Sequence, residues 1–229
     1  MEQGRLITFG CSFTFGHGLP DCIDENGHAL KSPSKLGWPN ILSSLLDCKE
    51  VCNESLPGAS NKHILSKIMM FDFKKGDIPI ILWTRKSRHS VFKDYKSYVT
   101  YMLAHLKRDS KDVYWNTLER SGYNVNKFKK NTITYFSDFY EEFDASFEQV
   151  VRMNYVHSYL ESKNIKSYQL MFDTELDIEM FKHMMLPNIN YHSVRYKVDY
   201  KIDEALDNSH PGIKSQQHFA INLRKWFFK

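Results

Sequence analysis

The residues best suited to chemistry lie at the two ends of the chain. Near the start, residues 5–9 form a short apolar, β-prone run, Gly10 ends it, and Ser12 follows two residues later. Several hydrolase folds expose a nucleophilic hydroxyl in this way, on a glycine-flanked turn at the end of a strand. Glycine permits the sharp turn and the close approach of a substrate. A serine that only satisfies turn amides has the same pattern, so this turn alone does not define a site.

Near the other end, Asp207 and His210 precede the last amphipathic segment. A carboxylate three residues before a histidine can fold back and accept the imidazole Nδ1–H, which leaves Nε2 free to take a proton from a hydroxyl. An exposed histidine in a surface Asx turn gives the same spacing. If the two ends meet, Ser12, His210 and Asp207 can act as nucleophile, general base and orienting carboxylate.

A regular alternation of strand and helix patterns predicts the scaffold that would bring these residues together. Apolar, β-prone runs predict strands at residues 5–9, 49–55, 78–84 and 167–172. Apolar residues at intervals of three and four predict helices at residues 40–46, from the N-cap Ser60 through Met69, and at 143–162, 176–185 and 212–228. The order predicts an α/β fold, a three-layer α/β/α, flavodoxin-like doubly wound parallel sheet. Loops at the carboxyl edge of such a sheet bind ligands.

The middle of the chain departs from this alternation. Residues 86–143 are polar and rich in Lys, Tyr, Asn and Ser, with a helix predicted at 95–106. They lack an apolar set large enough for a core of their own. We therefore expect residues 1–229 to form a single domain in which 86–143 is a helical insertion or lid. Residues 191–205 fit neither a strand nor a helix pattern unambiguously.

The composition is that of a globular protein and excludes several classes. Of 229 residues, 42% are hydrophobic and 25% charged, with a formal net charge of +4. The basic residues are scattered, whereas nucleic-acid binders usually carry a dense basic stripe, so no nucleic-acid partner is expected. No apolar stretch reaches the roughly 18 residues that span a bilayer. Neither a membrane partner nor a secretory signal is indicated, and a cytoplasmic location is expected. The oligomeric state stays open.

Four cysteines fall in the first quarter of the chain, at positions 11, 22, 48 and 52. In a reducing compartment we expect them to be free thiols. Cys48 and Cys52 have the spacing of half a zinc site that His17 or His28 would complete, but no second ligand pair at zinc-like spacing exists. We therefore expect no metal and no organic cofactor.

Three short blocks of the sequence resemble the SGNH, or GDSL-like, hydrolases. The first block surrounds Ser12 from Ile7 to Gly16, the second runs from Asn53 to Asn61, and the last is Asp207-x-x-His210-Pro. Each block is short, but the three occur in order over nearly the whole chain. The resemblance implies that Ser12 is the nucleophile, His210 the general base and Asp207 its orienting residue.

The resemblance also implies an oxyanion hole and shows where this chain departs from the family. The backbone N–H groups of Ser12 and Gly58 would be two donors. The third family block normally supplies an Asn amide, but this chain has Thr84, Arg85 and Arg88 in that region and no Asn. Loss of one oxyanion donor typically costs about 2.7–4 kcal/mol of barrier. The Thr84 hydroxyl can donate instead, and an arginine can supply charge, with a preference for an anionic substrate as a consequence.

By this resemblance the chain is expected to be a serine ester hydrolase. It would act on a small-molecule or glycan ester, for example an acetyl group on a carbohydrate. Arg85, Arg88, His17 and Asn61 are the expected substrate contacts. Two alternatives stay open. One is a catalytically weak or inactive SGNH-like module that binds a glycan or a protein. The other is an accessory protein of a virus or mobile element, suggested by abundant Lys, Asn, Tyr and Phe.

Overall fold

The computed structural model describes residues 4–24, 30, 32–92, 98–102, 106, 119, 122–174 and 178–228. Within these ranges, five parallel strands form one sheet in the order β2-β1-β3-β6-β7. The strands are β1 (Arg5–Phe9), β2 (Glu50–Asn53), β3 (Ile78–Leu82), β6 (Tyr168–Phe172) and β7 (Tyr191–Val194). Four of them lie within the predicted ranges. The fifth, β7, lies in the segment whose sequence was ambiguous.

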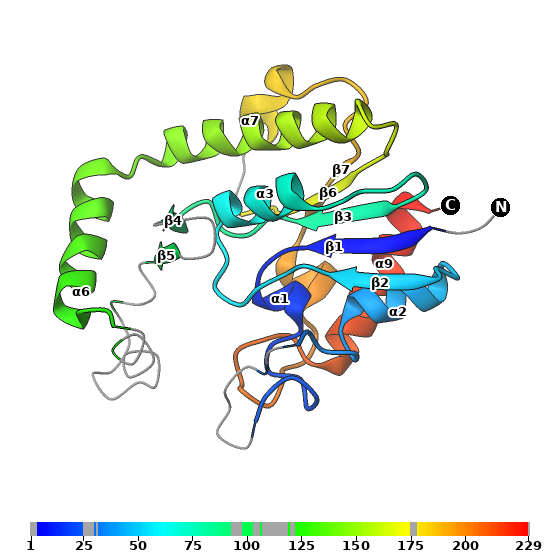
Figure 1. Cartoon of the computed structure of the whole chain (residues 1–229), viewed down its shortest axis with the longest axis horizontal. Helices are drawn as coiled ribbons and strands as arrows, with labels where there is room; N and C mark the ends of the chain where they lie inside the picture. Colours follow the sequence, from blue (N-terminus) through cyan, green and yellow to red (C-terminus); the bar gives the residue numbers. More distant parts are fainter. Residues whose placement is uncertain are drawn as a thin grey trace.

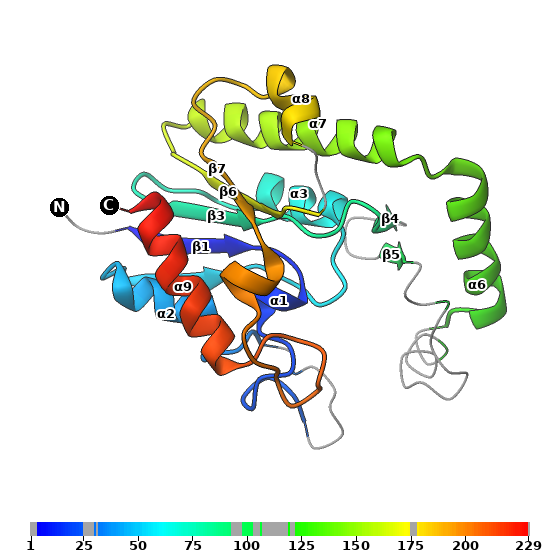
Figure 2. The same ribbon diagram turned by 180° about the vertical axis from the view of Figure 1, so that it is seen from behind.

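Helices cover both faces of the sheet (Figures 1 and 2). One face carries α2 (Trp38–Leu45) and α9 (Ile213–Phe227), and the other carries α3 (Asn61–Met70) and α7 (Glu142–Glu161). The predicted three-layer α/β/α fold is therefore confirmed. The predicted N-cap is also found, since the Ser60 hydroxyl accepts the N–H of His63 at 3.2 Å.

The alternation of side chains along the strands builds two cores. In β3, Ile80 and Leu82 face α2 and α9, whereas Ile81 faces α3 and α7. All three are fully buried, which explains why β3 is an uninterrupted apolar run: both of its faces are covered. The sheet thereby holds the carboxyl ends of its strands at one edge, and the loops that follow them carry the candidate site.

The described part of residues 86–143 contains a two-stranded hairpin and a helix beside the sheet (Figure 1). The hairpin pairs β4 (His89–Phe92) with β5 (Tyr98–Tyr101), and α6 (Val125–Thr134) leads through a π-helical turn, Tyr135–Phe139, toward α7. The helix predicted at 95–106 is wrong at β5; residues 93–97 and 103–105 lie outside the described residues. The physical reason is cross-strand pairing, in which the Thr100 and Ser90 hydroxyls bond at 2.7 Å and Val99 packs on Phe128.

The helix predicted at residues 176–185 is found in the part of that segment that the structure describes. A short helix, α8 (Ile178–Phe181), continues into a 3-10 turn at Lys182–Met184. The ambiguous segment divides into β7 and a π-helical turn at Tyr196–Tyr200. None of the helices in the described ranges has the length and apolarity needed to cross a membrane.

Candidate active site

Ser12 begins the four-residue helix α1 (Ser12–Phe15), directly after the end of β1. Gly10 makes this tight transition possible, because a Cβ at that position would lie 2.1 Å from Thr14 Oγ1. Gly16 ends α1 in the left-handed conformation and donates its N–H to the Ser12 carbonyl. The sequence thus folds locally into a strand–turn–helix with Ser12 at its corner, 6% exposed.

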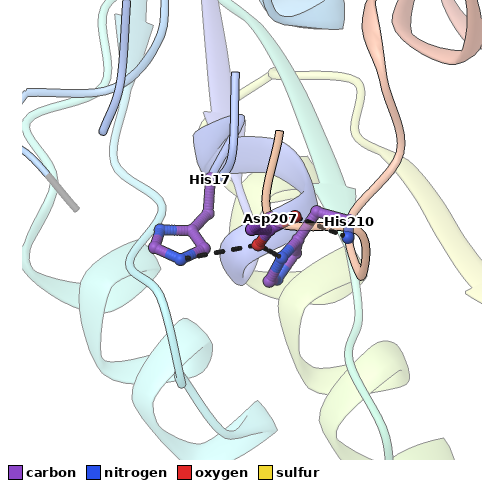
Figure 3. A group of neighbouring side chains, drawn as sticks. All are labelled: His17, Asp207 and His210. Carbon is purple, nitrogen blue, oxygen red and sulfur yellow. Dashed lines mark hydrogen bonds and ion pairs between the residues drawn. The ribbon is translucent and has the colours of Figure 1, made fainter. Parts of the chain in front are cut away.

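Asp207 and His210 lie in the turn before α9, and Asp207 folds back onto the imidazole (Figure 3). His210 Nδ1 lies 2.5 Å from Asp207 Oδ2. The other carboxylate oxygen, Oδ1, accepts the backbone N–H groups of Ser209 at 3.2 Å and His210 at 3.1 Å. The turn therefore fixes the carboxylate at both oxygens and orients the imidazole through Nδ1.

The electrostatics of this pair suit a general base. Burial by itself would raise the pKa of Asp207, but the backbone N–H, charge and imidazole of His210 lower it to about 2. Burial lowers the pKa of His210 below its ordinary value, and it outweighs the opposing effect of Asp207. At neutral pH, Asp207 is ionised and His210 is uncharged. In the tautomer that this contact favours, Nδ1 carries the proton toward Asp207 and Nε2 is unprotonated.

The two ends of the chain meet at this place. The ring of Phe13, the residue after Ser12, lies edge-on to His210 with ring centres 5.6 Å apart. The Leu206 N–H donates to the carbonyl of Gly18 at 3.0 Å, and a Cβ on Gly18 would lie 2.6 Å from Asp207 Oδ1. Among the described residues Ser12 and His210 share no hydrogen bond. The helix that Ser12 begins therefore packs on His210 through Phe13.

His17 lies against the Asp207–His210 pair. Its ring centre is 4.7 Å from that of His210, and its Nε2 is 3.8 Å from Asp207 Oδ2 (Figure 3). His17, Asp207 and His210 have donor atoms within 4.8 Å of one another, a spacing that a metal ion can use. The Asp207–His210 hydrogen bond already accounts for this proximity. The four cysteines are free thiols, and His28 lies outside the described residues.

Gly58 and Thr84, the other predicted oxyanion donors, lie in neighbouring loops that side chains hold together. Gly58 has φ of 76°, with open space where a Cβ would be. The Asn61 amide donates to the Thr84 carbonyl at 3.0 Å and accepts the Thr84 N–H at 2.8 Å. Arg88 donates from Nη1 to the carbonyl of Ala59, next to Gly58, at 3.1 Å. Asn61, 3% exposed, thus positions Thr84 through its backbone.

A cavity of about 490 Å³ opens beside Cys11 and Phe13, the two neighbours of Ser12, and we call it the Arg88 cavity. Neither Ser12 nor His210 is among the described residues that line it. Its walls come from the loops after four strands of the sheet. The loop after β1 contributes Cys11 and Phe13, and the loop after β3 contributes Thr84, Arg85 and Arg88. The loop after β6 contributes Asp173 and Thr174, and the segment after β7 contributes Arg195 to Val198. Binding at the carboxyl edge of a parallel sheet is the general rule for this type of fold. Three predicted site residues, Thr84, Arg85 and Arg88, thus line one cavity with the two neighbours of Ser12.

Sequence reasoning missed the contribution of the segment after β7. Arg195, Tyr196 and Lys197 line the Arg88 cavity, yet residues 191–205 were left without an assignment. The signal that would have found them is the strand itself. Once Tyr191–Val194 is recognised as the last parallel strand, the residues that follow it must lie at the ligand-binding edge.

Comparison with family models and with curated proteins gave no match. Among solved structures, a carbohydrate esterase shares 11% identity, with a TM-score of 0.51 over 96% of this chain and 63% of that one. An acetyl xylan esterase, Est2A, from the rumen bacterium Butyrivibrio proteoclasticus shares 12% identity, with a TM-score of 0.54 over 99% of this chain and 65% of that one. This chain therefore spans less than two thirds of either structure.

Those comparisons define the fold. This chain shares its three-layer α/β/α fold with these two esterases, and the fold that the resemblance to the SGNH, or GDSL-like, hydrolases implied is confirmed. A putative lipolytic protein of the G-D-S-L family from Desulfitobacterium hafniense also aligns, at 11% identity over 97% of this chain and 99% of that one. Its TM-score of 0.44 is too low to add to the argument. Because the same fold carries many activities, the function must be argued from the site.

Proposed function

We propose that this protein is a serine ester hydrolase in which Ser12, His210 and Asp207 act together. The observation that carries the proposal is the Asp207–His210 pair, with Nδ1 and Oδ2 at 2.5 Å, packed on the helix that Ser12 begins. That helix stands at a cavity at the carboxyl edge of the sheet. This arrangement supplies a hydroxyl, an oriented uncharged imidazole and room for a substrate.

The reaction would proceed by acyl transfer through the enzyme. Ser12 Oγ attacks the ester carbonyl carbon, and its proton passes to Nε2 of His210. The tetrahedral intermediate collapses and expels the alcohol, which takes that proton. Water then attacks the acyl-enzyme, again giving its proton to His210, and the acid leaves with the proton returned to Ser12. Asp207 stays ionised throughout and stabilises the imidazolium form of His210.

The oxyanion would be stabilised by the backbone N–H groups of Ser12 and Gly58 and by the Thr84 hydroxyl. Arg88 supports this assignment, because its guanidinium is tied to Ala59 beside Gly58. A cation close to the developing negative charge can offset the missing Asn of the third family block. Without an offset, the loss would slow the reaction by about 10²–10³.

The substrate class follows from the names of the two esterases with the same fold. One acts, by its name, on a carbohydrate ester, and the other is named as an acetyl xylan esterase. We therefore propose a small acyl group, such as acetyl, on a carbohydrate or another small molecule. Aromatic side chains at the cavity, among them Phe13 and Tyr196, suit either a sugar ring or an acyl chain.

The decisive test is covalent labelling of the nucleophile. A fluorophosphonate probe should modify the wild-type protein at Ser12, and mass spectrometry of the peptide locates the adduct. Ser12→Ala should abolish the label and hydrolysis of 4-nitrophenyl acetate. The exposed serine variant Ser44→Ala, on α2, should retain both. Labelling that is absent, or unaffected by Ser12→Ala, would contradict the hydrolase.

The alternative is a module that binds a glycan or ester without turning it over. Two observations favour it. Residues 83–89, directly after β3, contain no Asn, and Ser12 and His210 share no hydrogen bond among the described residues. Catalytic hydrogen bonds often tighten only when substrate is bound, so the second observation is compatible with either reading. An unlabelled protein that still binds an acetylated oligosaccharide would establish the module instead.

A further inference from the structure

The Arg88 cavity has an unequal distribution of charge. Its described lining includes four basic side chains, Arg85, Arg88, Arg195 and Lys197, and one acidic side chain, Asp173. They come from the loops after β3 and β7, which lie far apart in sequence. Cations that converge from separate segments on one cavity are the usual means of binding an anionic group.

Arg195 adds less charge than its formal value, because Asp199 accepts from its Nη2 at 3.0 Å and its Nε at 3.2 Å. That ion pair fixes the guanidinium at the rim of the cavity, where 64% of the side chain is exposed. If the charges of Arg195 and Asp199 are counted as cancelling, the described lining still carries three basic side chains and one acidic side chain.

Arg88 is the inner cation, and its hydrogen bonding is incomplete. Nη1 donates to the Ala59 carbonyl at 3.1 Å, but the Nε–H is buried and has no partner among the described residues. A buried N–H donor without an acceptor destabilises the folded protein, because its hydrogen bond to water has not been replaced. An anionic oxygen from a ligand would satisfy it, and a guanidinium can hold carboxylate or phosphate oxygens through two parallel hydrogen bonds.

The neighbouring thiol reports the same positive potential. Complete burial would by itself raise the pKa of Cys11, yet the pKa is lowered, with the charge of Arg88 as the largest opposing cause. Cys11 lines the cavity and precedes Ser12. Negative charge is therefore stabilised at the inner wall, one residue from the candidate nucleophile.

Three aromatic side chains form another part of the wall. Phe13 stacks on Tyr196 with ring centres 5.5 Å apart and planes 8° from parallel, and Phe172 lies edge-on to both. An apolar wall beside a cationic one suits a ligand with an organic body and one charged group. A purely neutral acyl chain would leave the buried Nε–H of Arg88 without an acceptor among the described residues.

We propose that the substrate is an anionic ester, whose acyl or alcohol part carries a carboxylate, sulfate or phosphate group that binds Arg88, with Lys197 adding to the field. This assignment rests on the proposed hydrolase for the ester bond, but the anion site itself can be tested apart from catalysis. It narrows the substrate from any small acyl ester to one bearing a second, negatively charged group.

The kinetic experiment compares two esters with the same leaving group. Mono-4-nitrophenyl succinate carries a carboxylate on the acyl side, and 4-nitrophenyl butyrate does not. We expect kcat/KM corrected for the uncatalysed rates to favour the succinate by at least tenfold at low salt. Arg88→Gln and Lys197→Gln should each lower this ratio several-fold, and 0.5 M NaCl should reduce it as well. Lys225→Gln, exposed on α9 outside the cavity, should leave the ratio unchanged.

The binding experiment is independent of turnover. Ser12→Ala is titrated calorimetrically with succinate, inorganic sulfate and phenyl phosphate, which distinguishes carboxylate, sulfate and phosphate as the preferred group. Binding that weakens at least fivefold in Ser12→Ala/Arg88→Gln supports the site, whereas Arg88→Lys should retain part of the affinity. Circular dichroism and thermal melts establish that each variant is folded.

The possible results separate the two proposals. Hydrolysis of the neutral ester with no preference for the succinate and no anion binding would overturn the anionic substrate and leave the hydrolase standing. Arg88-dependent anion binding without labelling of Ser12 would retain the anion site and remove the hydrolase. If neither labelling nor anion binding occurs, both proposals are wrong.

Discussion

His210 presents its Nδ1 to Asp207 at 2.5 Å, and the two residues belong to one turn that packs on the first helix of the chain. The turn holds the carboxylate with two backbone N–H groups, so its position does not depend on the histidine alone. Because backbone N–H groups hold one carboxylate oxygen and His210 contacts the other, the role of the carboxylate can be tested while His210 is kept.

Replacement of Asp207 by Asn should lower kcat/KM for ester hydrolysis by a factor on the order of 10²–10⁴. The amide cannot stabilise the imidazolium, and its NH₂ group favours the wrong imidazole tautomer. Stopped assays with 4-nitrophenyl acetate measure the loss, with Asp138→Asn on the exposed turn before α7 as the matched control. A folded Asp207→Asn protein with unchanged activity would remove Asp207 from the mechanism.

The pH dependence of kcat/KM should show an acid limb with its midpoint below 6.5. In the proposed mechanism His210 acts as a base only when uncharged, and burial lowers its pKa below the ordinary value. Activity should therefore persist as pH falls past 6.5 and be lost as His210 is protonated. Asp207 raises the pKa of His210. In the pH profile of Asp207→Asn, the acid limb of the residual activity should therefore have its midpoint at a still lower pH. Measurement of both profiles with one ester tests this, and a midpoint above 6.5 would contradict it.

Much of the scaffold was predictable, because burial on both faces leaves a direct trace in the sequence. The run Ile78–Leu82 is apolar throughout, and Ser60 stands at a helix start that Ile64 and Ile68 continue. Local signals of this kind also placed Ser12 and Asp207 correctly at a strand end and before the last helix. The pairing of one strand with another leaves no such signal in the local sequence. Tyr98–Tyr101 forms a strand because it pairs with β4, which a pattern within residues 95–106 cannot indicate.

The site was less predictable than the fold, because contacts between distant segments decide it. The sequence predicts Asn61 as a substrate contact, but it does not reveal that the Asn61 amide bonds the backbone of Thr84, twenty-three positions away. It likewise predicts His17 as a substrate contact without revealing that His17 Nε2 lies 3.8 Å from Asp207 Oδ2. Arg195 and Lys197 reach the Arg88 cavity only because Tyr191–Val194 joins the edge of the sheet.

Asn61→Ala should lower the free energy of unfolding by about 1–3 kcal/mol, because the Thr84 N–H and carbonyl lose buried partners. Asn61→Asp is the matched variant. It keeps an acceptor for the N–H but sets a carboxylate oxygen against the Thr84 carbonyl, so it should be destabilised as well. Urea denaturation at pH 8 measures both. If Thr84 helps to bind the oxyanion, kcat should fall in Asn61→Ala by a larger factor than KM rises. Equal stability of the wild type and both variants would show that the Asn61–Thr84 hydrogen bonds do not stabilise the fold.

His63 should make the protein sensitive to acid. Its side chain is 5% exposed and stacks over Phe92, and burial lowers its pKa to about 4. Between pH 6.5 and pH 4 the unfolded chain binds a proton at this position that the folded chain does not, so the free energy of unfolding falls as pH falls through that window. The full effect of this one group is about 3 kcal/mol. Urea denaturation of wild type and His63→Gln at pH 7.5, 5.5 and 4.5 isolates it. We expect the variant to be less stable at pH 7.5, through lost packing, but to lose less of its stability on acidification. Parallel pH dependences of the two proteins would show that His63 is protonated equally in the folded and unfolded states.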